Sequence, residues 1–360
     1  MKKKTLLTLL LGLFLCAPVA LSGCGEQKEE PNSSSTDDIK SRDEIINAVG
    51  ERYYAEVEFN STDTQKATYT IITNGSWTYA NLGTEALLEK AGDVYYSYLK
   101  AGEEATKYNT VAKTNSAIVE NIGNLTELFY ATDTIHYTSK QKVSFLSRNA
   151  TDYITKMKVD LPTGKAEVYD HVVIDDLTGV CMKHSIEASS TVGGESVSGA
   201  ASFEMKKFYT GNNSEIGNAI QKEIDKIAVK KWDDAFLQRM GITGLRVFNA
   251  ELAYANFNED EQENQLVYTY NSSESKADGF AKFKTYAEGI IATGANKDFD
   301  GNTVTSYEAS PEYNDMMETT GTASFRGYTA NGSCVSITAM YSENGWSFVI
   351  ILTYKLPAQA

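Results

Sequence analysis

The sequence predicts an α+β protein built on a large curved antiparallel sheet with a few helices, followed by a smaller C-terminal α+β domain. Three observations lead to this prediction. Side chains alternate with a period of two from about Tyr54 onward, which is typical of strands. Turn sequences such as Asn74-Gly75 separate the runs at short spacing. Few segments have the spacing of a helix face, so few helices are left to cover one concave face of the sheet.

The predicted elements of the first domain, residues 39–230, begin with a short helix at 39–49. Further helices are predicted at 116–130 and 214–229, the last with Ile216, Ile220, Ile224 and Ile227 on one stripe. The predicted strands lie at residues 54–59, 68–73, 77–81, 86–90, 94–99, 134–138, 143–147, 153–159, 167–174, 180–188 and 196–208.

The second predicted domain covers residues 231–360. One helix is expected at 275–293, where apolar residues share a face and Gly294 follows. The strands predicted around it lie at residues 247–257, 265–270, 303–309, 322–329, 333–341 and 347–354. The result is a small sheet with one helix across it.

The N-terminus has the pattern of a secretory signal. Lys2, Lys3 and Lys4 precede an apolar run at 6–15, and Leu21-Ser22-Gly23-Cys24 closes the segment. The apolar run is too short to span a membrane. Because a cysteine follows the small residues, residues 1–23 resemble a bacterial lipoprotein signal peptide with its lipobox. That resemblance implies a diacylglyceryl group on the Cys24 sulfur and cleavage just before it; an ordinary secretory signal with an accidental cysteine is the alternative.

Residues 24–38 have no apolar residue able to anchor them and are predicted to form a flexible tether. Removing residues 1–23 takes away three lysines and no acidic residue, which changes the formal net charge from −15 to −18. So acidic a chain argues against binding nucleic acid, or an anionic bilayer, through the globular surface. The two acyl chains on Cys24 are therefore expected to do the anchoring, outside the cytoplasm at the cell membrane.

The order of strands and helices in the first domain resembles the bacterial lipoprotein-carrier and lipoprotein-receptor family and related surface lipoproteins. The segments that carry the resemblance are residues 54–59, 67–73, 92–98 and 172–179. The resemblance spans about residues 40–230 and implies a curved half-barrel that holds acyl chains. Members of the carrier family have a single domain, so the additional residues 231–360 argue against a shuttle role.

Few residues suggest catalysis or metal binding. His136, His171 and His184 all fall in predicted strands, but their spacing fits no ligand motif, so structural histidines are favoured over a metal triad. No Gly-x-Ser-x-Gly or His-Glu-x-x-His motif occurs. The paired acids Asp175-Asp176 and Asp233-Asp234 are attributed to capping and solvation rather than to acid–base chemistry.

Two further features have an ordinary interpretation. Residues 298–302 alternate oxygen ligands, but the glycine comes too early for a calcium loop, so a polar hairpin turn is favoured. After processing, Cys181 and Cys334 are the remaining cysteines. They are predicted to be buried small hydrophobes, with a disulfide between them as the alternative.

The predicted function is therefore binding, with no enzyme activity, no cofactor and no metal. The ligand is an amphiphilic or lipid-like molecule, or the partner is an envelope protein; a scaffold with a packed interior and a hydrolase are the competing classes. The predicted groove lies between the sheet and the helices at 116–130 and 214–229. The side chains expected to line it are those of Tyr69, Ile71, Tyr95 and Phe145.

Overall fold

The computed structural model describes residues 39–62, 64–100, 105–114, 116–130, 137–161, 164–192, 195–258 and 264–354. The chain divides into two compact units, each built on antiparallel strands. Unit 1 comprises Met1–Glu85 and Ser116–Gln221, and unit 2 comprises Ala86–Asn115 and Lys222–Ala360. The domain boundary that the sequence predicts between residues 230 and 231 stays a prediction.

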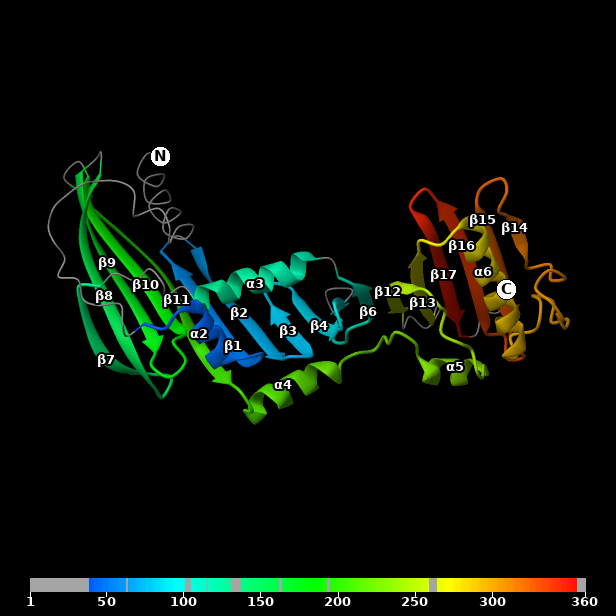
Figure 1. Cartoon of the computed structure of the whole chain (residues 1–360), viewed down its shortest axis with the longest axis horizontal. Helices are drawn as coiled ribbons and strands as arrows, with labels where there is room; N and C mark the ends of the chain where they lie inside the picture. Colours follow the sequence, from blue (N-terminus) through cyan, green and yellow to red (C-terminus); the bar gives the residue numbers. More distant parts are fainter. Residues whose placement is uncertain are drawn as a thin grey trace. The chain divides into compact units, whose positions relative to one another are not determined.

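Unit 1 contains the large curved antiparallel sheet that the sequence predicts (Figure 1). Its neighbouring strands pair in the order β7-β8-β9-β10-β11-β1-β2-β3, each pair antiparallel. The strands are β1 (Arg52–Ser61), β2 (Thr64–Asn74), β3 (Trp77–Asn81), β7 (Ser139–Phe145), β8 (Arg148–Leu161), β9 (Gly164–Asp175), β10 (Cys181–Val192) and β11 (Glu195–Thr210).

The period-two pattern of the sequence is seen directly in β1. Tyr53, Ala55 and Val57 are buried, whereas the side chains between them are partly exposed. Successive side chains of a strand point to opposite faces, so one face of the sheet lies on a core. On the other face Glu56 and Glu58 bind lysines of β11.

Three helices accompany this sheet: α2 (Arg42–Val49), α3 (Ser116–Tyr130) and α4 (Ser214–Ile224). α2 begins at a capping box, in which the Ser41 hydroxyl accepts from the Glu44 amide and the Glu44 carboxylate accepts from the Ser41 amide. This cap explains why the helix starts at Arg42 rather than at Ile39. α3 has the bounds that the helical spacing predicts.

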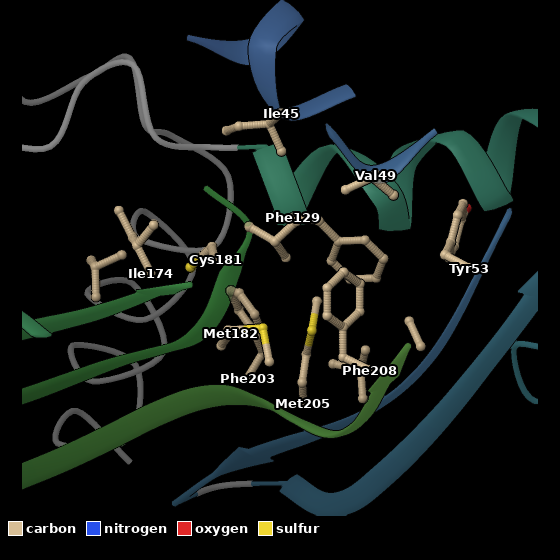
Figure 2. Packing of buried hydrophobic residues seen from close by; sticks show 14 of the residues in the cluster. Ile45, Val49, Tyr53, Phe129, Ile174, Cys181, Met182, Phe203, Met205 and Phe208 are labelled. Carbon is tan, nitrogen blue, oxygen red and sulfur yellow. The ribbon is translucent and has the colours of Figure 1, made fainter. Parts of the chain in front are cut away.

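The core of unit 1 fills the space between the sheet and the helices α2 and α3. Figure 2 shows Phe129 reaching from α3 toward the sheet, where Met205 and Phe208 lie. The buried members of this core are Ile45, Val49, Tyr53, Ala55, Val57, Ile71, Phe129, Tyr153, Val172, Ile174, Val180, Cys181, Met182, Phe203, Met205 and Phe208. Large side chains from both layers interdigitate here, which stabilises the sheet against α3.

Unit 2 is built from antiparallel strands that come from both of its chain segments. The pairing order is β4-β5-β6-β12-β13-β17-β16-β15-β14. Its strands are β4 (Glu85–Ala91), β5 (Val94–Leu99), β6 (Thr110–Lys113), β12 (Glu251–Asn258), β13 (Gln265–Ser272), β14 (Asn314–Met316), β15 (Thr322–Tyr328), β16 (Cys334–Ser342) and β17 (Gly345–Thr353). The helices are α5 (Asp234–Met240) and α6 (Lys276–Ala292), and α6 packs on β15, β16 and β17.

Several local predictions are wrong. Of the strand predicted at 134–138, residues 137 and 138 belong to no strand, and residues 134–136 lie outside the described residues. The strand predicted at 303–309 is irregular apart from a bridge between Lys297 and Thr303. The helix predicted to reach Val229 ends at Ile224, because the backbone of residues 226–228 bonds to Tyr108 instead. The strand predicted at 143–147 is displaced: β7 spans Ser139–Phe145, and residues 146–147 form a turn. For the helix predicted at 214–229, long-range backbone pairing overrides the local pattern.

Candidate functional site

The predicted lipidation site, Cys24, and the predicted histidine His136 lie outside the described residues. The signal pattern at 1–23 and the tether at 24–38 lie there too. Among the helices of the described residues, none has the length and apolar character needed to cross a membrane. The anchor therefore stays a prediction from the sequence.

The four predicted groove residues lie in different surroundings. Ile71 on β2 is fully buried in the core of unit 1. Tyr69, two residues earlier, is half-buried with its ring 5.4 Å from that of Phe59. Phe145 at the end of β7 is partly buried and packs on the same core. Tyr95 is on β5 in unit 2, so three of the four lie in unit 1, where Ile71 and Phe145 share the core.

The two described histidines each face an aspartate. His184 Nε2 on β10 lies 2.8 Å from Asp170 Oδ1, and His171 Nδ1 on β9 lies 3.4 Å from Asp152 Oδ2. Asp152 is buried and also accepts from the Gln141 amide. Within the described residues, His, Cys, Asp and Glu side chains do not gather in groups of three or more that could hold a metal ion.

Three turns with acidic residues stand out in the sequence, and in two of them the acid caps a helix or closes the turn. Asp233 caps α5 by accepting from the Phe236 amide, as capping predicts. Asp298 accepts from the backbone and side chain of Asn302 and closes the polar turn. At the third place, solvation is the wrong explanation for Asp175, whose side chain is only 1% exposed.

A cavity of about 460 Å³ lies in unit 1 beside the turn that joins β9 to β10. We call it the lysine cavity, because three lysines are among its lining residues. Those residues are Lys40, Lys140, Gln141, Lys142, Thr151, Tyr153, Ile174, Asp175, Asp176 and Gly179. The pairing of β7 with β8 and of β8 with β9 brings the three strands together, while Lys40 comes from the segment just before α2.

The Asp175 carboxylate, at one wall of the cavity, is fully engaged by its neighbours. It accepts two bonds from the Arg148 guanidinium and two from the Thr178 amide and hydroxyl. Burial alone would raise the pKa of Asp175, but the bonds from Arg148 and Thr178 outweigh it and hold the pKa below its ordinary value. Asp175 is therefore an ionised, internally neutralised support of the turn.

The neighbouring acid, Asp176, carries the negative charge at the cavity rim. Its carboxylate accepts from Thr151 at 2.6 Å and pairs with Lys142 at 2.9 Å. Burial acts to raise the pKa of Asp176, and the bonds from Thr151 and Lys142 more than offset it, so the pKa is lowered. Around the cavity, Asp175 is thus paired with Arg148, and Asp176 is paired with Lys142.

One wall of the cavity is aromatic and apolar. The ring of Tyr153 lies 4.9 Å from that of Tyr137 in an edge-on contact, and Lys140 Nζ stands 5.7 Å from the Tyr137 ring. Tyr153 and Ile174 also belong to the buried core. The cavity thus sets lysine side chains beside two residues of the buried core of unit 1.

Sequence reasoning does not single out the lysine cavity. The only local signal is the alternation of Lys140 and Lys142 on β7, which puts both on one face of the strand. Lys40 joins them through a contact with Leu177, 137 residues away in the sequence, and Asp176 through contacts with Thr151 and Lys142 that span 25 and 34 residues. The turn at 175–179 reads as a hairpin turn and no more.

Both cysteines of the described residues, Cys181 and Cys334, are free and buried. Burial raises the pKa of each thiol to about 12. The prediction of two buried small side chains is confirmed, and neither thiol has the character of a nucleophile.

Comparison with known proteins adds nothing to this picture: no protein-family model matches the chain, and no match is found among curated proteins.

Proposed function

We propose that this protein is a membrane-anchored extracytoplasmic lipoprotein that binds an amphiphilic ligand with an anionic head group and catalyses no reaction. Cys24 is the lipid anchor in this proposal, and residues 24–38 are the tether, both on the strength of the signal pattern. The observation that carries the binding role is the lysine cavity, which sets cationic side chains beside an apolar wall in an otherwise acidic chain.

Charge and size favour an anionic amphiphile over other small molecules. Lys40, Lys140 and Lys142 line the cavity and supply ammonium groups that bind a phosphate or carboxylate head group in this proposal. The apolar wall at Tyr153 and Ile174 supplies contact for a hydrocarbon chain. A volume of about 460 Å³ lies within the roughly 300–1,000 Å³ of small-molecule sites.

The resemblance to the lipoprotein-carrier and lipoprotein-receptor family is part of the same proposal. A half-barrel that holds acyl chains is consistent with the curved sheet of unit 1 and with α3 across it (Figure 1). We also keep the division into a sheet domain at 39–230 and a smaller α+β domain at 231–360 as a proposal. In this arrangement the second domain serves an envelope partner rather than the ligand.

A second candidate function is a surface scaffold with no small-molecule ligand. The specific observation in its favour is the core beneath α3, where Phe129, Met205 and Phe208 are buried at the predicted place of the groove. With the core filled there, the lysine cavity is the ligand site in our proposal. The two functions are therefore separated by whether that cavity binds a probe.

The anchor is tested by replacing its cysteine. Wild-type protein should incorporate labelled fatty acid and partition into detergent, whereas Cys24→Ser should do neither, because the two acyl chains are the anchor in this proposal. Equal labelling of the variant would refute lipidation at Cys24.

The binding role is tested with dansyl-undecanoic acid, a fluorescent anionic amphiphile, on residues 24–360 carrying Cys24→Ser. Saturable binding is expected, with weaker binding of the uncharged methyl ester. The double variant Lys140→Ala/Lys142→Ala should raise Kd by about tenfold, since two charge contacts are lost.

The matched control is Lys90→Ala/Lys222→Ala, which removes two exposed lysines outside the cavity. It should leave Kd within about twofold of the wild-type value, because exposed charges that do not touch the ligand act weakly. Absence of saturable binding to the wild-type chain would favour the scaffold function instead.

A further inference from the structure

Five neighbouring strands of unit 2, paired in the order β13-β17-β16-β15-β14, have α6 on one face. Gly279 of the helix and Trp346 of β17 mark that face, because a Cβ on the glycine would meet the tryptophan ring. Successive side chains of a strand point to opposite faces. Ser347, Val349 and Ile351 of β17 therefore point away from α6, onto what we call the open face.

The pairing register arranges the open face in three rows across the strands. The rows are Met316, Thr322, Met340, Ser347 and Asn271; Asn314, Ser324, Thr338, Val349 and Thr269; and Arg326, Ser336, Ile351 and Val267. Among the described residues of these rows, Arg326 is the sole charged side chain. The open face is thus almost uncharged in a chain that is strongly acidic.

The open face also exposes apolar side chains. Met316 and Met340 are each 43% exposed, and both belong to the row of Thr322. Val349 and Ile351 are partly exposed in the neighbouring rows. Valine, isoleucine and threonine side chains on a flat pleated surface are typical of a sheet face that packs on another sheet.

The outer face of the unit 1 sheet shows how a solvated sheet face is built in the same chain. There Glu58 pairs with Lys66 and Lys206, and Glu204 pairs with Lys206 and Lys183. Charges of both signs keep an exposed surface soluble and discourage association. The rows of the open face carry no such ladder within the described residues, which indicates that this face is built for contact.

Charge indicates what the open face contacts. The chain has a formal net charge of −15, so two copies repel each other over most of their surface. At the open face, two copies can meet without setting acidic side chains against each other. A cationic partner would find no carboxylate in the rows described above, and an anionic partner would find only Arg326.

The size of the open face fits a two-fold contact between copies. Strands about 4.8 Å apart and rows about 7 Å apart give a footprint of roughly 500 Å² for this face. In a two-fold contact each copy contributes the same patch, so roughly 1,000 Å² is buried in total, which is the lower limit of a specific interface. The area is therefore sufficient for a weak, reversible dimer.

We propose that the open face is a self-association surface, on which two copies of the chain stack sheet against sheet in a two-fold dimer. Apolar side chains of one copy pack between those of the other, with the two sheets about 10 Å apart. Thr338, at the centre of the middle row, lies near the two-fold axis. The proposal depends neither on the lipid anchor nor on the ligand of unit 1.

Sedimentation velocity of residues 24–360 carrying Cys24→Ser tests for the dimer. The sedimentation coefficient should rise with concentration, with a Kd of about 1–100 μM for a contact of this size. Thr338→Glu should raise Kd at least about tenfold, because it brings two like charges together at the axis. The matched control is Thr285→Glu at an exposed position of α6, which should leave Kd within about twofold.

A charge swap distinguishes a two-fold contact from other modes of association. Thr338→Lys should weaken the dimer as Thr338→Glu does, because like charges again meet. An equimolar mixture of the two variants should form a heterodimer with a Kd close to that of the wild-type sequence, because opposite charges then face each other. Recovery in the mixture also shows that both variants are folded.

A smaller substitution gives a second measurement, should either charged variant prove unfolded by circular dichroism. Thr338→Cys should be linked into dimers by a short bismaleimide, whereas Thr285→Cys, on the α6 side, should stay mostly monomeric. A wild-type sequence that stays monomeric up to about 500 μM would overturn the proposal. So would a dimer that both charged variants leave unchanged, or Thr338→Cys that is linked no more than Thr285→Cys.

Discussion

Arg148 and Asp175 form a two-pronged ion pair at the end of the unit 1 sheet, with Nε 2.8 Å from Oδ1 and the second nitrogen 2.9 Å from Oδ2. The Asp175 carboxylate is almost completely buried, and Arg148 also stands 5.5 Å over the ring of Phe208. The pair ties the β7–β8 turn to the β9–β10 turn. It therefore holds in place the two turns beside the lysine cavity.

Replacing Asp175 with Asn should destabilise the protein by about 2–4 kcal/mol at pH 7, because Arg148 then lacks its buried partner. Urea unfolding followed by tryptophan fluorescence gives the free energy. Asp93→Asn, in the exposed turn between β4 and β5, is the control and should change stability by less than about 0.5 kcal/mol.

The same pair makes stability depend on pH. The pKa of Asp175 is lower in the folded than in the unfolded chain, so its contribution is present above the unfolded pKa of about 3.9. It is lost as pH falls through the folded pKa. The difference in unfolding free energy between wild type and Asp175→Asn should thus shrink below about pH 4; a constant difference down to pH 2 would contradict this.

Gly279 on α6 allows the helix to approach Trp346 on β17. A Cβ at this position would lie 2.1 Å from Trp346 Nε1, which donates to the Ser275 carbonyl at 3.0 Å. Gly279→Ala should therefore destabilise the protein by about 1–3 kcal/mol, because the ring or the helix must move. Chemical denaturation and the near-ultraviolet signal of the tryptophans report the change.

Gly289, on the same helix, supplies the control. An added Cβ there meets no atom within 4 Å. Gly289→Ala should stabilise the helix by about 0.5–1 kcal/mol, since alanine loses less backbone entropy than glycine. If both substitutions changed the stability in the same direction, the close approach of α6 to Trp346 would not explain their effects.

Cys181 and Cys334 should resist thiol reagents in the native protein. Each thiol is buried with a pKa of about 12, so little thiolate exists at pH 8. Residues 24–360 carrying Cys24→Ser should react slowly with Ellman's reagent in the native state and release two equivalents after unfolding. Ser144→Cys, at an exposed position of β7, should react at once. No release after unfolding without a reductant would show a disulfide.

The sequence alone is enough to predict the strand-rich antiparallel fold, α3 and most strands of unit 1. These elements are predictable because their patterns depend only on residues close together in the sequence. Examples are the alternation along β1, the helical spacing of α3 and turn pairs such as Asn74-Gly75. The signal pattern before Cys24 is local in the same sense. It is why a lipid anchor is predictable although those residues lie outside the described structure.

The tertiary structure alone decides which distant segments meet. β6 pairs with β12, where Thr110 Oγ1 bonds to Asn256 Oδ1. Register and partner choice depend on contacts between segments far apart in the sequence, which no local pattern encodes. For the same reason the lysine cavity, assembled from Lys40, β7 and the β9–β10 turn, is visible only in the folded chain.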